Sequence, residues 1–347
     1  MKKGFLYKAT MLLTATFLFG NIQTSEACTR IVYQGTNNSN VITARSMDWK
    51  DEIDANLWIF PRGMERNGSV GSNSVTWSSK YGSVITSAWD IATTDGINEK
   101  GLVANILWLV ETEYAHFNPA GNKKGITISA WAQYVLDNFA TVDETVKALE
   151  KEEFVVVSDY IPGTQKFATL HLSISDATGD NAIFEYINGK LVIHHGNQYN
   201  IMTNSPIFNE QLAISEYWGA VAGTEFLPGT NRAPDRFRRA GYYIKAIPQD
   251  TDARTAIASV FSVIRNCSVP YGISSETEPN ISSTRWRSVS DQKNLMYFFE
   301  TVKTPNTFWV DLKKVDFSKK GKVKRFRKRI WRACLRKNDE YSGNRRQ

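Results

Sequence analysis

The chain has 347 residues, 42% of them hydrophobic, so it is long enough to bury a large core, and its three cysteines are too few for a disulfide framework. Its four histidines lack metal-ligand spacing such as HExxH, and no glycine-rich phosphate loop occurs, so we expect no metal and no cofactor. The net charge of +7 is unevenly spread: residues 318–347 carry +11 and residues 1–27 carry +2, which leaves residues 28–317 at −6 and argues against a nucleic-acid partner.

The segment before Cys28 has the pattern of a secretion signal. A lysine-rich start precedes the uncharged stretch MLLTATFLFG (11–20), and small residues, Ser25 and Ala27, stand at the positions that a signal peptidase reads. The apolar stretch is too short to span a bilayer, which takes about 20 residues. The pattern therefore predicts that residues 1–27 are a signal peptide, that the chain is exported across the inner membrane, and that the mature protein begins at Cys28.

A lipoprotein signal is the alternative interpretation, and in it Cys28 would carry a lipid. Such signals place a large aliphatic residue three positions before the cysteine and small residues after that position. Ser25 and Glu26 fit this pattern poorly. A free thiol and a free α-amine at Cys28 are therefore the preferred prediction.

The first part of the body is rich in strand patterns. The segments TRIVYQGT (29–36) and NVITARSMDW (40–49) flank the turn GTNNSN (35–40), which predicts a hairpin. Two more apolar segments, SVITSAWDI (83–91) and LVANILWLV (102–110), also read as strands. We interpret TTDGINEKG, which lies between them, as a polar turn.

Helices and strands then follow in blocks. The segment ISAWAQYVLDNFA (128–140) has helical spacing, and Thr141 with Glu144 forms a capping box for the next helix. The later segments are ATLHLSISD (168–176) and NAIFEYINGKLVIHHG (181–196) as strands, NEQLAISEYW (209–218), DRFRRAGYYIKAI (235–247) and DARTAIASVFSVIRNC (252–267) as helices, and RWRSVSDQKN (285–294), LMYFFE (295–300) and NTFWVDL (306–312) as strands. Such blocks, with no linker or repeat between them, predict a single α+β domain over residues 28–317.

An N-terminal cysteine would place a nucleophile and a base on one residue. The α-amine of a peptide has a pKa of about 7.7–8.0, near neutral pH, so it can accept the proton of the neighbouring thiol. In the uncleaved chain the same nitrogen belongs to an amide and cannot act as a base. Removal of residues 1–27 would therefore activate Cys28.

Such a site needs a cation that lowers the thiol pKa and a carboxylate that binds the ammonium. Arg45 and Asp48 satisfy both needs, and the predicted hairpin returns them to the side of Cys28. Taken alone, an Arg-x-x-Asp pattern fits a surface ion pair at least as well.

The ordered motifs resemble one known family. Cys-Thr at the predicted mature start and the segment RSMDW are followed in order by FPRGM, DGINEKGLV, VLDNFATV, MTNSPIFNEQL, LPGTNRAPDRFRRA and SSTRWRSVSDQKN. Together they are similar to the choloylglycine hydrolase family of N-terminal-nucleophile hydrolases, which includes bile salt hydrolases and penicillin V acylases. The resemblance covers residues 28–317 and implies a four-layer αββα fold of two stacked, mainly antiparallel sheets covered by helices.

The resemblance also implies roles for individual residues. Cys28 would be the nucleophile and its α-amine the base, while Arg45 would lower the thiol pKa and Asp48 would bind the ammonium. Asn204 would donate to the oxyanion through its side-chain amide, and Arg236 would complete the electrostatics of the site. From the residues alone, Asn204 could be a turn residue before Ser-Pro, and Arg236 could lie on a solvated helix face.

Trp108 departs from the family pattern. Relatives carry Asn or Tyr here, close to the oxyanion and the substrate, whereas this chain has NILWLV. Trp108 fits either a wall of the substrate pocket or the core. Asn105 is nearby, but an odd separation along a strand would turn it to the opposite face.

The resemblance implies hydrolysis of a linear amide through an acyl-thioester on Cys28. It favours conjugated bile salts as substrates, with penicillin V and N-acyl-homoserine lactones as alternatives. It also implies a periplasmic location, as in the secreted Gram-negative branch, and a homo-oligomer, commonly a tetramer. A lipid- or steroid-binding protein without chemistry is the rival interpretation, and it would not need Cys28, Arg45, Asp48 and Asn204 together.

The last 30 residues, 318–347, do not resemble the family and form a basic, atypical tail. Phe326, Ile330 and Cys334 recur every four residues among basic residues, as on a cationic helix that contacts anionic lipid. A solvated tail and a shift of reading frame are simpler interpretations. We assign this tail no function, and membrane contact is only one of its alternatives.

Overall fold

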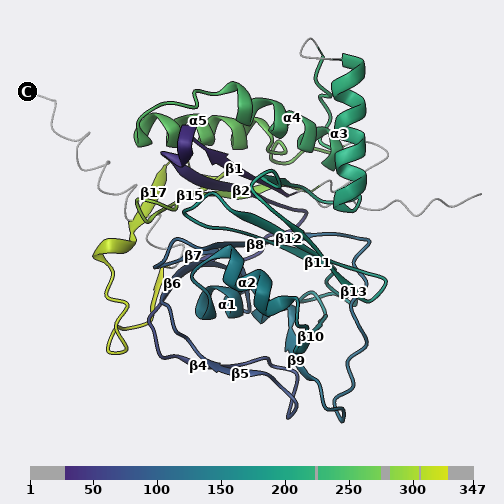
Figure 1. The fold of residues 1–347 in the computed structure, drawn as a ribbon, viewed down its shortest axis with the longest axis vertical. Coiled ribbons are helices and arrows are strands. Elements are labelled where there is room, and N and C mark those ends of the chain that lie inside the picture. Colours follow the sequence, from purple (N-terminus) through teal and green to yellow (C-terminus); the bar gives the residue numbers. More distant parts are fainter. Residues whose placement is uncertain (1–27, 223–225, 275–281, 305, 327–347) are drawn as a thin grey trace, which may run out of the picture.

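The computed structural model describes residues 28–222, 226–274, 282–304 and 306–326. Two β-sheets are stacked face to face, and helices cover the outer face of each sheet (Figure 1). The chain therefore forms four layers in the order helix, sheet, sheet, helix, and the predicted α+β sandwich is confirmed.

The first sheet carries the predicted nucleophile and has six strands in which all neighbours are antiparallel. Across the sheet the strands are β14 (Ile201–Met202), β1 (Thr29–Gln34), β2 (Val41–Trp49), β15 (Ser283–Asp291), β16 (Met296–Thr301) and β17 (Thr307–Asp311). The predicted hairpin is the β1–β2 pair, in which Thr29 lies opposite Ser46.

The second sheet has eight strands and is also antiparallel throughout. Its strands in spatial order are β13 (Lys190–His195), β12 (Asn181–Ile187), β11 (Leu170–Ser175), β8 (Val103–Trp108), β7 (Ala92–Asn98), β6 (Ser83–Ala88), β3 (Asn56–Phe60) and β18 (Lys324–Phe326). Two small pairs lie outside the main sheets, namely β4 (Glu65–Asn67) with β5 (Thr76–Ser78), and β9 (Lys124–Thr127) with β10 (Phe154–Val157).

The helices lie on the outer faces of the two sheets (Figure 1). Helices α1 (Ile128–Asn138) and α2 (Val142–Leu149) pack on the eight-stranded sheet. Helices α4 (Ala233–Ala246) and α5 (Ala253–Asn266) pack on the six-stranded sheet, and α3 (Phe208–Ala222) packs against α4.

The predicted start of helix α2 is confirmed. The hydroxyl of Thr141 accepts from the backbone N–H of Glu144, and the Glu144 carboxylate accepts from the N–H of Ala140. These contacts satisfy backbone donors that a helix start would otherwise leave without partners.

Most of the segment interpreted as a polar turn belongs to strand β7, which ends at Asn98, and only its last three residues, 99–101, form a turn. Asp95 lies in the middle of β7 and is 1% exposed. The strand tolerates this buried carboxylate because the Asn105 amide and the Ser288 and Tyr297 hydroxyls donate to it from both sheets. The polar residues of the segment suggested a loop, but a buried strand can contain a carboxylate when hydrogen-bond donors reach both of its oxygens.

The chain continues on the second sheet beyond Phe317. Residues of strand β18 pair antiparallel with β3, Arg325 forms an ion pair with Asp90, and its guanidinium lies over the ring of Trp58. The start of the basic segment is thus part of the sheet edge, whereas Ile330 and Cys334 lie outside the described residues.

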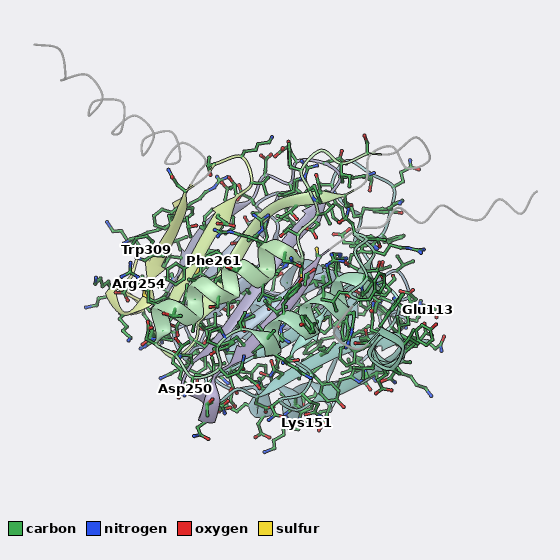
Figure 2. The ribbon with its side chains drawn as sticks, turned by 90° about the horizontal axis from the view of Figure 1, so that it is seen from above. Glu113, Lys151, Asp250, Arg254, Phe261 and Trp309 are labelled. Atoms are coloured by element: carbon green, nitrogen blue, oxygen red, sulfur yellow. The ribbon has the colours of Figure 1, made fainter. Side chains whose placement is uncertain are left out.

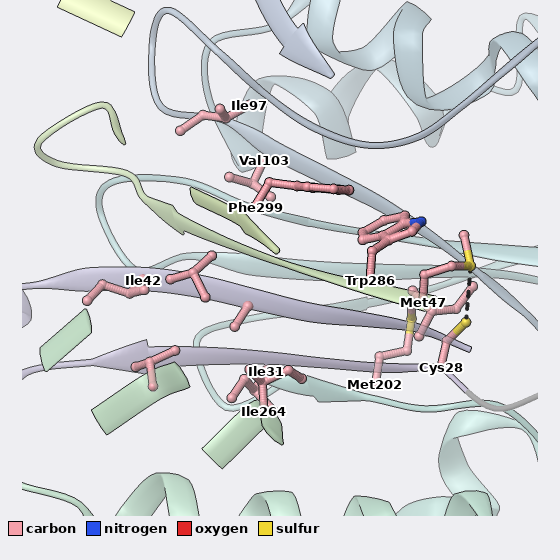
Figure 3. Packing of buried hydrophobic residues seen from close by; sticks show 14 of the residues in the cluster. Cys28, Ile31, Ile42, Met47, Ile97, Val103, Met202, Ile264, Trp286 and Phe299 are labelled. Atoms are coloured by element: carbon pink, nitrogen blue, oxygen red, sulfur yellow. Dashed lines mark hydrogen bonds between the residues drawn. The ribbon is translucent and has the colours of Figure 1, made fainter. Parts of the chain in front are cut away.

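The hydrophobic core lies between the layers. Figure 3 shows Ile97, Val103 and Phe299 between the two sheets, and Ile31 and Ile264 between the first sheet and its helices. A second cluster, with Trp131 at its centre, fills the space under α1 and α2. Figure 2 shows charged residues such as Lys151 and Asp250 at the rim of the molecule. Among the described residues, no helix is both long and apolar enough to cross a membrane.

Candidate active site

Cys28 lies directly before β1, at one end of the six-stranded sheet, and is 2% exposed. Its Sγ lies 3.8 Å from Met47 Sδ (Figure 3) and 3.8 Å from the backbone oxygen of Asp48. The β1–β2 register produces this proximity, because Thr29 opposite Ser46 places the end of β2 beside the thiol. Since residues precede Cys28 in this chain, its nitrogen is here a peptide nitrogen.

Arg45 is buried between the two sheets and is 1% exposed, so it is not part of a surface ion pair. Its guanidinium donates to the backbone oxygens of Thr94 and Ile106, which belong to β7 and β8, and it lies 5.0 Å from the ring of Trp286. Strands of the second sheet therefore hold this cation, which comes from the middle of β2, between the two sheets. A buried guanidinium stays charged, as its predicted role requires.

Asp48 is completely buried, and its carboxylate accepts from the hydroxyls of Thr284, at 2.5 Å, and Ser46, at 3.3 Å. Burial raises the pKa of Asp48 to about 6, although the positive charge of Arg236 and these two hydroxyls oppose the rise. A buried carboxylate with this pKa would be stabilised by an ammonium group beside it. In the uncleaved chain the Cys28 nitrogen donates instead to Asn204.

Asn204 follows β14 and is 3% exposed, so it is more than a turn residue. Its Oδ1 accepts from the Cys28 nitrogen, at 2.5 Å, and from Arg236, at 2.9 Å. Its Nδ2 donates to the backbone oxygen of Trp108 at 2.8 Å. That bond uses one of the two amide hydrogens, and the other is available for an oxyanion on a substrate bound at the thiol.

Arg236 lies on α4 and is completely buried, so the alternative of a solvated helix face is wrong. Its Nη1 donates to the backbone oxygen of Cys28 and to the hydroxyl of Thr29, both at 2.5 Å, and its Nη2 donates to Asn204. One guanidinium therefore connects α4 to the start of β1 and to the predicted oxyanion donor. Burial lowers its pKa, and the Asp48 carboxylate is the largest opposing influence.

These charges act together on the thiol. Burial raises the pKa of Cys28, and the positive charge of Arg45 is the largest influence that lowers it, followed by the hydrogen bond to the backbone oxygen of Asp48 and then by Arg236. Asp48 acts in the opposite sense through its carboxylate. The structure thus brings Cys28, Arg45, Asp48, Asn204 and Arg236 together around one sulfur atom.

A mostly apolar cavity of about 160 Å³ opens beside the thiol, and Trp108 forms part of its wall. Trp49 packs edge-on against both Trp108 and Trp89, which makes an aromatic group on one side of the cavity. The remaining wall includes residues of β2, β6, β7, β8 and β11, the start of α1 and the loop that contains Asp159, Tyr160, Ile161 and Pro162. Trp108 is therefore a pocket residue as well as a buried one, while Asn105 turns away from the cavity and donates to Asp95.

Two parts of this site carry no recognisable signal in the sequence. Thr284, which holds the Asp48 carboxylate, lies in the segment SSTRWRSVSDQKN, but nothing in that segment distinguishes it from other hydroxyl residues. The second part is the loop around Tyr160, between β10 and β11, which also lines the cavity. In the described part of the chain, no group of three or more His, Cys, Asp or Glu side chains is arranged to hold a metal ion.

Comparison with known proteins gives a consistent assignment. A family model described as linear amide C–N hydrolases, choloylglycine hydrolase family, matches residues 28–324. A penicillin V acylase from Pectobacterium atrosepticum is 53% identical over 315 residues, which cover 86% of this chain and 84% of the relative. A bile salt hydrolase/transferase from Clostridium perfringens is 25% identical over 312 residues, which cover 83% of this chain and 93% of the relative.

The fold has a solved counterpart as well. The structure of penicillin V acylase from Agrobacterium tumefaciens superimposes with a TM-score of 0.80 at 60% sequence identity. The superposition covers 86% of this chain and 90% of that structure.

Proposed function

Because this chain belongs to the choloylglycine hydrolase family of linear amide C–N hydrolases, we propose that it hydrolyses N-acyl amides whose acyl group carries a single aromatic ring, with penicillin V as the representative substrate. The nucleophile in this proposal is Cys28, after removal of residues 1–27.

The size of the cavity at the thiol is the observation that carries the choice of substrate. Its volume is about 160 Å³. A dry cavity of about 150 Å³ can hold a benzene ring, whereas pockets for larger ligands run from about 300 to 1,000 Å³. A phenoxyacetyl group fits this space, and a steroid nucleus would require the walls to move.

The aromatic wall supports the same choice. Trp49, Trp89 and Trp108 surround the cavity, and aromatic rings favour edge-on or offset contacts with another ring. The high identity to penicillin V acylases adds to this support. Conjugated bile salts, which the sequence resemblance favoured, have the weaker support of a relative at 25% identity.

The proposed reaction begins with proton transfer from the Cys28 thiol to the free α-amine. The thiolate attacks the amide carbon, an S–C bond forms, and the carbonyl electron pair moves to oxygen. The Nδ2 hydrogen of Asn204 that is not bonded to Trp108 stabilises this oxyanion. Asp48 holds the ammonium and Arg45 stabilises the thiolate.

The intermediate then collapses, the C–N bond breaks, and the ammonium transfers its proton to the leaving amine. A water molecule attacks the resulting thioester, with the α-amine again accepting a proton. The C–S bond breaks, the carboxylic acid leaves, and the thiolate returns. All protons are accounted for by the α-amine, so neither a metal nor a cofactor is needed.

The test uses protein that begins at Cys28, with Cys28→Ala as the control. We expect release of phenoxyacetate from penicillin V, a rate that exceeds taurine or glycine release from conjugated bile salts, and no turnover by the variant. N-Acyl-homoserine lactones with acyl chains of graded length would serve as a third substrate series.

A faster rate with bile salts would overturn the choice of acyl group but keep the amidohydrolase mechanism. Folded protein with an intact thiol that hydrolysed none of these amides would instead support the binding-protein alternative. An intact mass about 1 kDa above that of the cleaved chain, after export in cells, would reveal lipidation of Cys28 and contradict the proposed nucleophile.

A further inference from the structure

A buried cluster of ionisable groups lies beside the site but outside the proposed mechanism. His171 on β11 and Glu185 on β12 are each 2% exposed, and His194 on β13 is 9% exposed. His171 Nδ1 lies 3.1 Å from Glu185 Oε1, and His194 Nε2 lies 3.5 Å from Glu185 Oε2. Charged groups this deeply buried are costly unless they are paired, so the cluster calls for an explanation.

The contacts of His171 determine where its hydrogens lie. Its Nε2 is 2.9 Å from the backbone oxygen of Thr203, and its Nδ1 faces the Glu185 carboxylate. A carbonyl oxygen can only accept a hydrogen bond, and an ionised carboxylate can only accept as well. Both ring nitrogens must therefore donate, which makes His171 an imidazolium.

The surroundings of Glu185 favour its ionised form. Burial acts to raise its pKa, but the hydrogen bonds from His171 and the backbone N–H of Phe208, together with the nearby ring of His194, prevail and hold the pKa at about 2. The N–H of Phe208 belongs to the first residue of α3, where the helix dipole also favours a negative charge.

The acceptor of the second bond leads directly to the site. Thr203 precedes Asn204, and its hydroxyl donates to the backbone oxygen of Ala233 at the start of α4, the helix that carries Arg236. Gln211 on α3 donates to the backbone oxygen of Asn204 at 3.0 Å. The short segment that carries Asn204 is thus held from β11, α3 and α4 together.

We propose that His171, kept as an imidazolium by Glu185, is a positioning residue that holds Thr203 and thereby directs the Asn204 amide at the oxyanion. This inference rests on the proposed function of Asn204. His171 does not touch the substrate; it acts through one backbone oxygen. Among the described residues, Glu185 on β12 is the titratable group that pairs with His171, and His194 on β13 lies next to Glu185.

Two variants separate the two bonds of His171. In His171→Asn the side-chain amide nitrogen replaces Nδ1 and keeps the bond to Glu185 but loses the one to Thr203. In His171→Gln it reaches the position of Nε2 and keeps the bond to Thr203 but leaves Glu185 without its main counter-charge. We expect His171→Asn to lower kcat 10- to 100-fold with KM within about twofold, because small displacements of catalytic groups cost up to about 100-fold.

His171→Gln should keep kcat within about threefold of the unchanged protein while lowering Tm, since its defect is an uncompensated buried charge. His195→Asn is the matched control. His195 Nε2 also lies near a carboxylate, at 2.8 Å from Asp180, but this pair is partly exposed, because His195 faces the opposite side of β13 from its neighbour His194. It should leave both kcat and Tm unchanged.

The protonation state has its own measurement. In ¹⁵N-histidine-labelled protein at pH 7, long-range ¹⁵N–¹H correlation, with the His171 signal assigned by its loss in the variants, should show hydrogens on both ring nitrogens. One protonated nitrogen at this pH would overturn the imidazolium. Equal kcat for His171→Asn and His195→Asn would overturn the positioning role, even if Tm fell.

A failure of the proposed function would be distinguishable. If no amide were hydrolysed, crystal structures of His171→Asn and of the unchanged protein would still decide the matter, because the inference requires Asn204 Oδ1 to move away from the Cys28 nitrogen in the variant. Unmoved Asn204 would refute the positioning role irrespective of activity.

Discussion

At the scale of single residues, Asp48 carries the largest conflict between function and stability. The carboxylate is completely buried, and its pKa is raised from 3.8 to about 6. The folded chain therefore binds this proton more tightly than the unfolded chain does. The contribution of this protonated carboxyl group to the stability of the folded chain is fully present below about pH 3.8 and is lost as the pH rises through about 6.

Asp48→Asn should consequently stabilise the uncleaved chain at neutral pH. A shift of this size corresponds to about 3 kcal/mol, since each unit is about 1.4 kcal/mol, and the gain should vanish near pH 4. Urea unfolding at a series of pH values measures it, with Asp143→Asn, on the exposed surface of α2, as the control. If the variant were less stable than the parent chain at pH 8, burial of the ionised Asp48 carboxylate would not be costly, which would contradict the prediction. In the mature protein that begins at Cys28, the same substitution should abolish turnover.

The residues of the site differed in how far the sequence identified them. Cys28 was marked by the cleavage pattern before it, and Arg45 and Asp48 by the hairpin that returns to it. Thr284 and His171 carry no local signal, because their importance lies in which oxygen atoms they meet across the sheets. Hydrogen-bond partners that are far apart in sequence can be assigned only in the folded chain.

At the scale of elements, β18 shows how a strand can be missed. Its residues lie in a run of basic side chains and have no alternating apolar pattern, yet they cover the edge of β3. Phe326 packs against the core, and Arg325 pairs with Asp90. Covering an edge strand removes a row of unpaired backbone groups, so the strand serves the fold despite its composition.

Phe326→Asp should therefore lower the stability of the mature protein. Loss of the partly buried ring is expected to cost about 1–2 kcal/mol, which corresponds to a few degrees in Tm. Differential scanning calorimetry would measure it, with Lys322→Asp, at an exposed position just before β18, as the control. Equal Tm values for the two variants would mean that β18 contributes nothing to the sheet edge.

Strand β7 was likewise missed because of its polar composition. The segment TTDGINEKG has the glycine and polar residues of a turn, but its Asp95 is satisfied by donors from β8, β15 and β16. Local composition predicts a loop here because the three donors lie on other strands and cannot be recognised from the segment itself. The capping box at Thr141 was predictable because both of its partners lie within one helical turn.

At the scale of the whole molecule, the two sheets determine where the chemistry occurs. Cys28 and Asp48 come from the first sheet, while the carbonyls that hold Arg45 come from the second. Helix α4, in the helical layer on the outer face of the first sheet, adds Arg236. The site therefore forms only when three of the four layers are assembled.

The same geometry predicts that the uncleaved chain is folded and inactive. Its Cys28 nitrogen is an amide that donates to Asn204 and has no lone pair for the thiol proton. We expect the chain with residues 1–27 to share the Tm of the mature protein within a few degrees but to show no turnover of penicillin V. Comparable turnover by both forms would exclude the α-amine as the base, and mature Cys28→Ser would control for loss of the thiol itself.

Ordered local motifs in the sequence were enough to predict the α+β class, the family and the candidate site residues Cys28, Arg45, Asp48, Asn204 and Arg236. The tertiary structure was needed to show that Trp108 lines a cavity of about 160 Å³ beside the thiol and that His171 contacts the backbone oxygen of Thr203, next to Asn204. The size of the cavity and the pairing of buried polar groups depend on contacts between side chains of different layers. Such contacts cannot be read from a local sequence pattern, because their partners are far apart in the sequence.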